Sequence, residues 1–258
     1  MKVIILAGGY GTRLSEYTKL IPKPMVEIGN KPILWHIMNH YSQYGYKEFI
    51  IALGYKGEVI KNYFLRYYAL NNDFTINLSD NKINYINERP QDWKVSLVDT
   101  GESTMTGGRI LRLKDMVEED DFMVTYGDAV SDIDISALVH EYKSSGKLAM
   151  VTSVHPTARF GELTIDENKF VREFKEKPQI NQGWINGGFF VLNRKVFDYI
   201  NDDSTVFERE PLEGLARDGE LKTYCHEGFW QCMDTVRDRD YLNNLWNSGN
   251  APWIGKEL

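Results

Sequence analysis

Met1-Lys-Val-Ile-Ile-Leu-Ala-Gly-Gly-Tyr-Gly-Thr-Arg-Leu14, continued by Ile21-Pro-Lys-Pro-Met25, is the stretch that decides the fold. Residues 3–7 form a short apolar run that ends abruptly in glycines, which is typical of a buried strand in a parallel sheet. The glycines let the chain fold back on itself and direct backbone N–H groups at a phosphate. Arg13 and Lys23 add a planar and a compact cation. The stretch therefore predicts a strand that leads into an anion-binding loop.

Two common glycine motifs fit this loop poorly. The spacing Gly9-x-Gly11-x-x-Leu14 lacks the third glycine of the dinucleotide fingerprint, and no Gly-Lys-Ser/Thr follows as in a P-loop. The missing glycine disfavours a nucleotide-dependent dehydrogenase. A tight strand-to-helix turn with incidental charges would explain the glycines, but it leaves Arg13 and Lys23 unexplained.

Composition and charge exclude several classes of function. The chain has 258 residues, of which 42% are hydrophobic and 26% charged, as in an ordinary globular protein. Its net charge of −7 argues against binding to nucleic acid or to an anionic membrane. No apolar run approaches the roughly 20 residues of a membrane helix. We expect no nucleic-acid partner, no membrane partner and a cytoplasmic location.

The cysteines and two of the histidines do not indicate a metal site. Cys225 and Cys232 match no zinc spacing and are too few for a disulfide framework, so we expect buried thiols. His36 and His40 are four positions apart on a predicted helix, without the glutamate of the zinc-protease motif. We expect them to lie at the edge of the apolar face of that helix.

The pattern along the chain alternates between strands and helices. Short apolar runs predict strands at 49–53, 94–99, 122–126, 148–154 and 184–192, and hairpins at 74–87 and 160–174. Helical spacing predicts helices at 31–44, 58–68, 110–117, 134–142, 194–200, 206–216 and 236–246. This order predicts an α/β protein whose parallel sheet is covered by helices on both faces. Because no linker interrupts it, we expect a single domain over residues 1–258.

Two aspartates follow apolar strands. Asp128 comes just after the strand at 122–126, and Asp234 follows the run from Phe229 to Met233. In open α/β sheets, ligands bind beyond the carboxyl ends of the strands. Two carboxylates with several waters are a usual way to hold Mg²⁺. Asp234 also fits the N-cap of the helix that begins at 236, and the sequence leaves both roles open.

A second glycine-rich loop, Thr100-Gly-Glu-Ser-Thr-Met-Thr-Gly-Gly-Arg109, precedes a predicted helix. Its small hydroxylated residues suit the wall of a base or ribose pocket. They suit a helix start with a Ser or Thr cap equally well.

Leu6–Leu14 followed by Pro22-Lys-Pro-Met25 resembles the signature of the sugar-1-phosphate nucleotidylyltransferases, and the likeness extends over nearly the whole chain. Thr100–Arg109 and Ser15-Glu16 look like the glucose-1-phosphate cytidylyltransferase branch. The resemblance implies a Rossmann-like domain with a mostly parallel mixed central sheet flanked by helices, plus a small β-rich sugar-binding lobe. It divides the domain into a nucleotide-binding part, about 1–130, and a sugar-phosphate-binding part, about 131–258.

The resemblance also implies a reaction. A cytidylyl group would pass from CTP to α-D-glucose 1-phosphate, giving CDP-glucose and pyrophosphate, in a homo-oligomer that uses Mg²⁺. The choice of cytosine rests on the resemblance alone. Thymidylyl or uridylyl transfer and a non-catalytic sugar-nucleotide-binding protein are the alternatives, although a sensor would be expected to lose one of the charged residues of the site.

The resemblance assigns roles to particular residues. Arg13 would bind the departing pyrophosphate, Lys23 would bridge the reacting phosphates, and Asp128 and Asp234 would share the Mg²⁺; these four are the expected catalytic residues. The expected nucleotide-binding residues are Leu6, Ala7, Gly8, Gly9, Tyr10, Gly11, Thr12, Arg13, Lys23, Thr104, Arg109 and Gly127. The expected sugar-phosphate-binding residues are Glu176, Lys177, Asn186 and Gly187.

Overall fold

A seven-stranded sheet forms the centre of the computed structural model, which describes residues 1–86, 91–156, 162–165, 167, 169–175 and 183–255. The strand order is β14-β10-β13-β8-β1-β4-β7. Neighbouring strands are parallel except where they pair with β13. The predicted α/β class with a mostly parallel mixed sheet is therefore confirmed. The strands are β1 (Val3–Leu6), β4 (Glu48–Leu53), β7 (Lys94–Asp99), β8 (Asp121–Tyr126), β10 (Ala149–Val154), β13 (Ile185–Asn193) and β14 (Leu221–His226).

The two faces of the sheet bury separate apolar clusters, because successive side chains of a strand point to opposite faces. In β1, Val3 and Ile5 belong to one cluster and Ile4 to the other. Helices α2 (Ile33–Gln43), α3 (Gly57–Leu65), α6 (Ile135–Ser145) and α8 (Val236–Asn247) contribute to the first cluster. The second contains residues of α5 (Thr106–Leu111), η4 (Arg194–Tyr199) and α7 (Glu210–Arg217). Helices thus cover both faces, as predicted.

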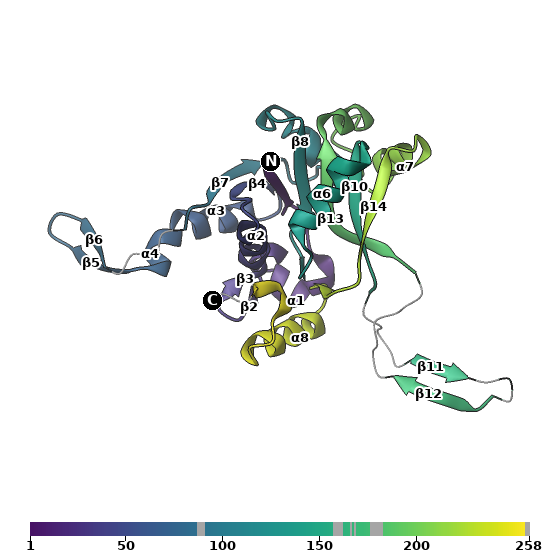
Figure 1. Cartoon of the computed structure of the whole chain (residues 1–258). Coiled ribbons are helices and arrows are strands. Elements are labelled where there is room, and N and C mark those ends of the chain that lie inside the picture. Colours follow the sequence, from purple (N-terminus) through teal and green to yellow (C-terminus); the bar gives the residue numbers. More distant parts are fainter. Residues whose placement is uncertain (87–90, 157–161, 166, 168, 176–182, 256–258) are drawn as a thin grey trace.

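Two hairpins reach away from this body on different sides (Figure 1). One pairs β5 (Asp73–Asn77) with β6 (Lys82–Ile86) and follows the short helix α4 (Tyr67–Asn71). The other pairs β11 (Glu162–Ile165) with β12 (Val171–Lys175). Both hairpins were predicted, the first of them from its alternating pattern.

Smaller elements complete the chain. They are η1 (Thr12–Leu14), α1 (Ser15–Thr18), η2 (Lys23–Met25), β2 (Glu27–Ile28), β3 (Lys31–Pro32), η3 (Lys114–Met116), β9 (Ala129–Ser131), β15 (Trp230–Cys232) and η5 (Pro252–Ile254). The β9–β15 pair matters most for function, because it places Ala129 opposite Cys232. The backbone N–H of Met233 also donates to the backbone carbonyl oxygen of Asp128 at 2.8 Å. Two distant segments that carry aspartates are thereby held side by side.

Several boundaries differ from the prediction. The helix expected at 31–44 begins at Ile33, because Lys31 and Pro32 pair with β2 as strand β3. The helix expected at 58–68 breaks at Arg66 into α3 and α4. The helix expected at 110–117 begins earlier, at Thr106, and ends at Leu111. Strands β2, β3, β9 and β14 were not predicted, whereas β15 lies within the apolar run 229–233 that was expected to be a strand.

The thiols and the histidines also differ from the prediction. Cys225 is exposed and Cys232 half-buried, so the expected buried thiols are wrong. His36 and His40 are buried rather than at the edge of a face, and each ring shares a hydrogen bond with a backbone carbonyl, of Ile28 and of Ile133. Burial lowers the pKa of His36 to about 4, which keeps the ring neutral. In the part of the chain that the structure describes, no helix is long and apolar enough to cross a membrane.

Candidate active site

The loops after the parallel strands meet at one edge of the sheet. Strands β8, β1, β4 and β7 run the same way, so the segments after Tyr126, Leu6, Leu53 and Asp99 emerge together. Strand β13 runs against them, and its first residues therefore lie at the same edge. The chain thus gathers both of its glycine-rich loops and the Asn186-Gly187 pair in one region.

A cleft of about 410 Å³ opens at this edge. It is lined by every residue expected to bind the nucleotide and by both aspartates: Leu6, Ala7, Gly8, Gly9, Tyr10, Gly11, Thr12, Arg13, Lys23, Thr104, Arg109, Gly127, Asp128 and Asp234. Its other lining residues were not expected: Pro24, Glu102, Ser103, Met105, Thr106 and Tyr126. Most of these belong to the second glycine-rich loop, whose composition pointed to a pocket wall without separating one residue from another.

Arg109 joins the two glycine-rich loops from beneath. Its side chain is buried, and its guanidinium donates to the carbonyls of Gly8, Leu53, Gly101 and Glu102 and to the hydroxyl of Thr100, at 2.7–3.1 Å. All five acceptors are neutral. The two terminal nitrogens of Arg109 are therefore engaged by the protein, while its positive charge lies in the lining of the cleft, on the side where it was expected.

Glycine is required where this guanidinium packs. A Cβ atom on Gly8 would overlap Arg109, and one on Gly54 would come within 2.5 Å of its Nη1. Burial lowers the pKa of Arg109, partly offset by the charge of Asp99, but an arginine remains protonated at any ordinary pH. The loop glycines thus make room for a buried cation as well as for a ligand.

Lys23 lies between the two aspartates. Its Nζ donates to Asp128 Oδ2 at 2.7 Å and to Asp234 Oδ1 at 2.6 Å. Burial lowers the pKa of Lys23, but the charges and hydrogen bonds of both carboxylates outweigh it, so the net pKa is above its usual value. The pKa of Asp234 shifts downward, because Lys23 and Arg13 outweigh the opposing effect of its burial. The site therefore holds a lysinium between two carboxylates.

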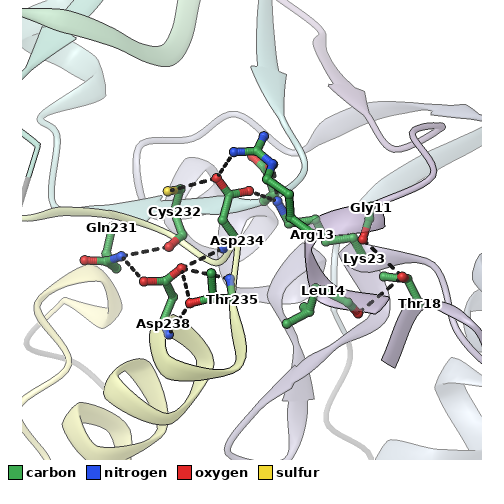
Figure 2. A network of polar contacts seen from close by, with 11 residues as sticks. Gly11, Arg13, Leu14, Thr18, Lys23, Gln231, Cys232, Asp234, Thr235 and Asp238 are labelled. Atoms are coloured by element: carbon green, nitrogen blue, oxygen red, sulfur yellow. Dashed lines mark hydrogen bonds and ion pairs between the residues drawn. The ribbon is translucent and has the colours of Figure 1, made fainter. Parts of the chain in front are cut away.

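Asp234 does not cap α8. That cap is Thr235, whose hydroxyl accepts from the backbone N–H of Asp238 while the Asp238 carboxylate accepts from the N–H of Thr235. Figure 2 shows this capping box beside Asp234, whose own carboxylate points to Lys23 and Arg13. Arg13 donates to Asp234 Oδ2 at 2.5 Å, yet its side chain is 71% exposed. Of the two roles left open by the sequence, the structure excludes the cap role for Asp234, because that role belongs to Thr235.

The carboxylates have a donor arrangement that suits a small divalent cation. Asp128 Oδ2 and Asp234 Oδ1 both lie within 2.7 Å of one cationic nitrogen, so they converge on a single point. Among the described residues, no cluster of three or more His, Cys, Asp or Glu side chains lies close enough to bind a metal. Mg²⁺ is commonly held by one or two carboxylates, with substrate phosphates and waters as the remaining ligands. Asp128 and Asp234 fit that pattern.

The residues expected on the sugar side divide into two pairs. Asn186 and Gly187 lie beside the cleft rather than in its lining, but Asn186 Nδ2 donates at 3.1 Å to the hydroxyl of Tyr126, which does line it. Glu176 and Lys177 lie outside the described residues. Tyr126 was missed because it reads as the last residue of an apolar strand.

Comparison with known proteins agrees with this geometry. A family model described as "Nucleotidyl transferase" matches residues 2–238. The chain is 53% identical to the glucose-1-phosphate cytidylyltransferase of Salmonella typhi, with 98% of each chain covered. It is 46% identical to a probable glucose-1-phosphate cytidylyltransferase of Bacillus subtilis, covering 98% of this chain and 99% of the relative. The crystal structure of HddC from Yersinia pseudotuberculosis matches with a TM-score of 0.70 at 26% identity, covering 95% of this chain and 99% of that one.

Proposed function

The chain belongs to the nucleotidyl transferase family, and from this premise we propose that it is a glucose-1-phosphate cytidylyltransferase. It transfers the cytidylyl group of CTP to α-D-glucose 1-phosphate and releases CDP-glucose and pyrophosphate. The observation that carries this conclusion is the 53% identity, over nearly the full length of both chains, to an enzyme of that name. The cleft supports it, because its glycine loops and cations suit a triphosphate.

The reaction needs positioning and charge neutralisation rather than a covalent intermediate. An oxygen of the sugar phosphate forms a bond to the α-phosphorus of CTP. The bond from that phosphorus to the bridging oxygen breaks, and its electron pair leaves with the pyrophosphate. The second pKa of a phosphate monoester is about 6, so the attacking group is already close to a dianion near neutral pH. No general base is required.

The positively charged side chains of the cleft bind the phosphate groups in this mechanism. The loop from Leu6 to Arg13 wraps the triphosphate, and Arg13, being largely exposed, is able to turn toward the departing pyrophosphate. Lys23 bridges the reacting phosphates and stabilises the charge that develops in the transition state. In the substrate-free arrangement its ammonium group is shared by Asp128 and Asp234. Binding of substrate therefore exchanges carboxylate contacts of Lys23 for phosphate contacts.

Asp128 and Asp234 would hold the Mg²⁺, since their oxygens converge on one cation position. When bound, the metal ion supplies Lewis-acid polarisation of the α-phosphate and a template for its orientation. The aspartates themselves fix where that ion is held, through the β9–β15 pair that joins their segments.

The sugar phosphate would be bound by Glu176, Lys177, Asn186 and Gly187. Of these, Asn186 and Gly187 lie on β13, next to the cleft.

Replacing Lys177 with alanine should mainly weaken binding of the sugar phosphate. A charge-assisted hydrogen bond contributes about 1.5–3 kcal/mol, so KM for glucose 1-phosphate should rise roughly 10- to 100-fold. The KM for CTP should stay within a few-fold of the wild type. Steady-state kinetics with each substrate varied in turn measures both values. A change confined to the KM for CTP would contradict the assignment of Lys177 to the sugar side.

Pyrophosphate release tests the function itself. The protein is incubated with glucose 1-phosphate, Mg²⁺ and, separately, each of the four ribonucleoside triphosphates and dTTP. Rapid release with CTP alone is expected. Release with UTP or dTTP instead would keep the mechanism and overturn the choice of base. No release with any of the five would contradict the proposed function.

We further propose that the enzyme acts as a single-domain homo-oligomer in the cytoplasm, where CTP is available. The hairpin of β5 and β6 supports self-association, because it projects from the body (Figure 1) and because it exposes large apolar side chains. These are Phe74, Ile76, Leu78, Ile83 and Ile86. Light scattering should give a mass that is a multiple of the 29.9 kDa of one chain.

A further inference from the structure

Glu208 lies behind the cleft and contacts two residues that line it. One carboxylate oxygen, Oε1, accepts from the hydroxyl of Tyr126 at 2.5 Å. The other, Oε2, accepts from the hydroxyl of Thr106 at 2.6 Å. Tyr126 and Thr106 both line the cleft, whereas Glu208 does not. Neither the sequence pattern nor the proposed mechanism gives this partly buried link a purpose.

The link continues to the sugar side through Tyr126. The Tyr126 hydroxyl accepts from Asn186 Nδ2 at 3.1 Å, and Asn186 Oδ1 accepts from the backbone N–H of Gly188 at 2.8 Å. Gly188 has a φ of 80°, and a Cβ atom there would overlap the ring of Tyr126. The ring and the amide are therefore held in one arrangement.

The link continues to the nucleotide side through Thr106. Its hydroxyl accepts from the backbone N–H of Phe207 at 2.9 Å, directly before Glu208. Two backbone hydrogen bonds join the same segments. The N–H of Met105 donates to the carbonyl of Asp203 at 2.8 Å, and the N–H of Gly107 donates to the carbonyl of Thr205 at 2.9 Å. The segment that carries Glu208 is thus fixed to the end of the loop 102–106, which forms one wall of the cleft.

The direction of each hydrogen bond follows from the chemistry of the groups. An ionised carboxylate only accepts, so both hydroxyls donate to Glu208. The oxygen of Tyr126 is then left as an acceptor for the Asn186 amide, while the Asn186 oxygen faces the N–H of Gly188. One acidic side chain thus determines how the amide on the sugar side is turned.

We propose that Glu208 is a positioning residue that couples the nucleotide side of the cleft to the sugar side through Thr106, Tyr126 and Asn186. This inference rests on the proposed function, which places the two substrates on those two sides. Because these groups are joined by hydrogen bonds, a ligand that shifts the loop 102–106 also shifts Thr106 and, through Glu208, Tyr126 and Asn186. Each substrate should therefore bind more tightly when the other is present, and by the same factor.

The test compares affinities in pairs. Binding of glucose 1-phosphate is measured by calorimetry without and with saturating CTP analogue, in which a methylene group replaces the oxygen between the α- and β-phosphorus and blocks transfer. In the wild type we expect the analogue to tighten binding about 10-fold, within the usual range of coupling between sites. In Glu208→Gln, the side-chain amide offers one oxygen to two hydroxyl donors. The ratio of the Kd for glucose 1-phosphate without the analogue to the Kd with it should then fall to near 1.

Two further variants keep the test decisive. Tyr126→Phe retains the bond between Glu208 and Thr106 but removes the link to Asn186, so it should also abolish the coupling, even if Glu208→Gln folds poorly. Adding Glu208→Gln to Tyr126→Phe should change the ratio no further, because both act on the same link. Glu210 is an exposed residue two positions away. Its substitution Glu210→Gln also removes a negative charge, but it should keep the wild-type ratio.

The outcomes separate this inference from the proposed function. A wild-type ratio near 1, or an unchanged ratio in Glu208→Gln and Tyr126→Phe, overturns the role of Glu208. Either result leaves cytidylyl transfer standing if the wild type still releases pyrophosphate with CTP. A wild type that releases none contradicts the function directly.

Discussion

Arg109→Lys should lower kcat/KM for CTP about 100-fold or more and should destabilise the fold by roughly 2–5 kcal/mol. Lysine keeps the positive charge but has one nitrogen with three donors in place of a planar fork. Arg109 serves five acceptors, four of them backbone carbonyls of the two glycine-rich loops and of the strand end between them. A three-donor nitrogen can serve at most three of them, so at least two of these five hydrogen bonds would be lost.

The loss of activity follows from the loss of position. Arg109 ties the carbonyl of Gly8, in the first loop, to those of Gly101 and Glu102, in the second. The cleft lies between these loops, so a shift of one relative to the other changes how the triphosphate is held. A displacement of about 1 Å in an active site is enough to cost roughly 100-fold in rate.

The measurements are urea unfolding and steady-state kinetics, with Arg112→Lys as the matched control. Arg112 lies three residues further along and forms its ion pair with Asp203 on the exposed surface. Exposed ion pairs contribute about 0–1 kcal/mol to stability, so the control should show almost wild-type stability and kinetics. Equal effects in the two variants would show that Arg109 has no special role in joining the loops.

The sequence predicted the framework of the fold because strand and helix periodicities are local. Short runs rich in apolar residues identified β1, β4, β7 and β8 within a residue or two. Strand β9 is three residues long and exists through its pairing with β15, which no local pattern encodes. The break at Arg66 and the strand pair that shortens α2 are likewise tertiary effects.

The candidate site shows the same division. The glycines, Lys23 and the aspartates could be found from the sequence, because each stands next to a recognisable strand end or turn. The position of Arg109 beneath two loops could not, since its acceptors are backbone carbonyls between 7 and 101 residues away. The role of Glu208 was hidden for a related reason: a lone glutamate in the first turn of the helix predicted at 206–216 reads as a solvated side chain.

Asp234→Asn should reduce kcat about 1,000-fold while leaving the fold intact. Loss of a charged metal ligand removes several kcal/mol of transition-state stabilisation, and each 1.36 kcal/mol is a factor of ten in rate. An amide keeps the size of the side chain but not its charge, so the pairing with Lys23 and Arg13 weakens as well. The Mg²⁺ concentration needed for half-maximal rate should also rise, which separates a metal ligand from a residue of purely structural importance.

The capping box provides a control for this prediction, because a substitution at the next residue should have the opposite effects on stability and on turnover. Thr235 caps α8 and Asp234 does not, so Thr235→Ala should cost about 1 kcal/mol of stability with only a modest change in kcat. Asp234→Asn should do the reverse. Thermal unfolding and pyrophosphate release are therefore measured on both variants. One of the two adjacent substitutions should lower stability and the other should lower turnover. If Asp234→Asn unfolds early and keeps its turnover, Asp234 is a structural residue and the metal site must be sought elsewhere in the cleft.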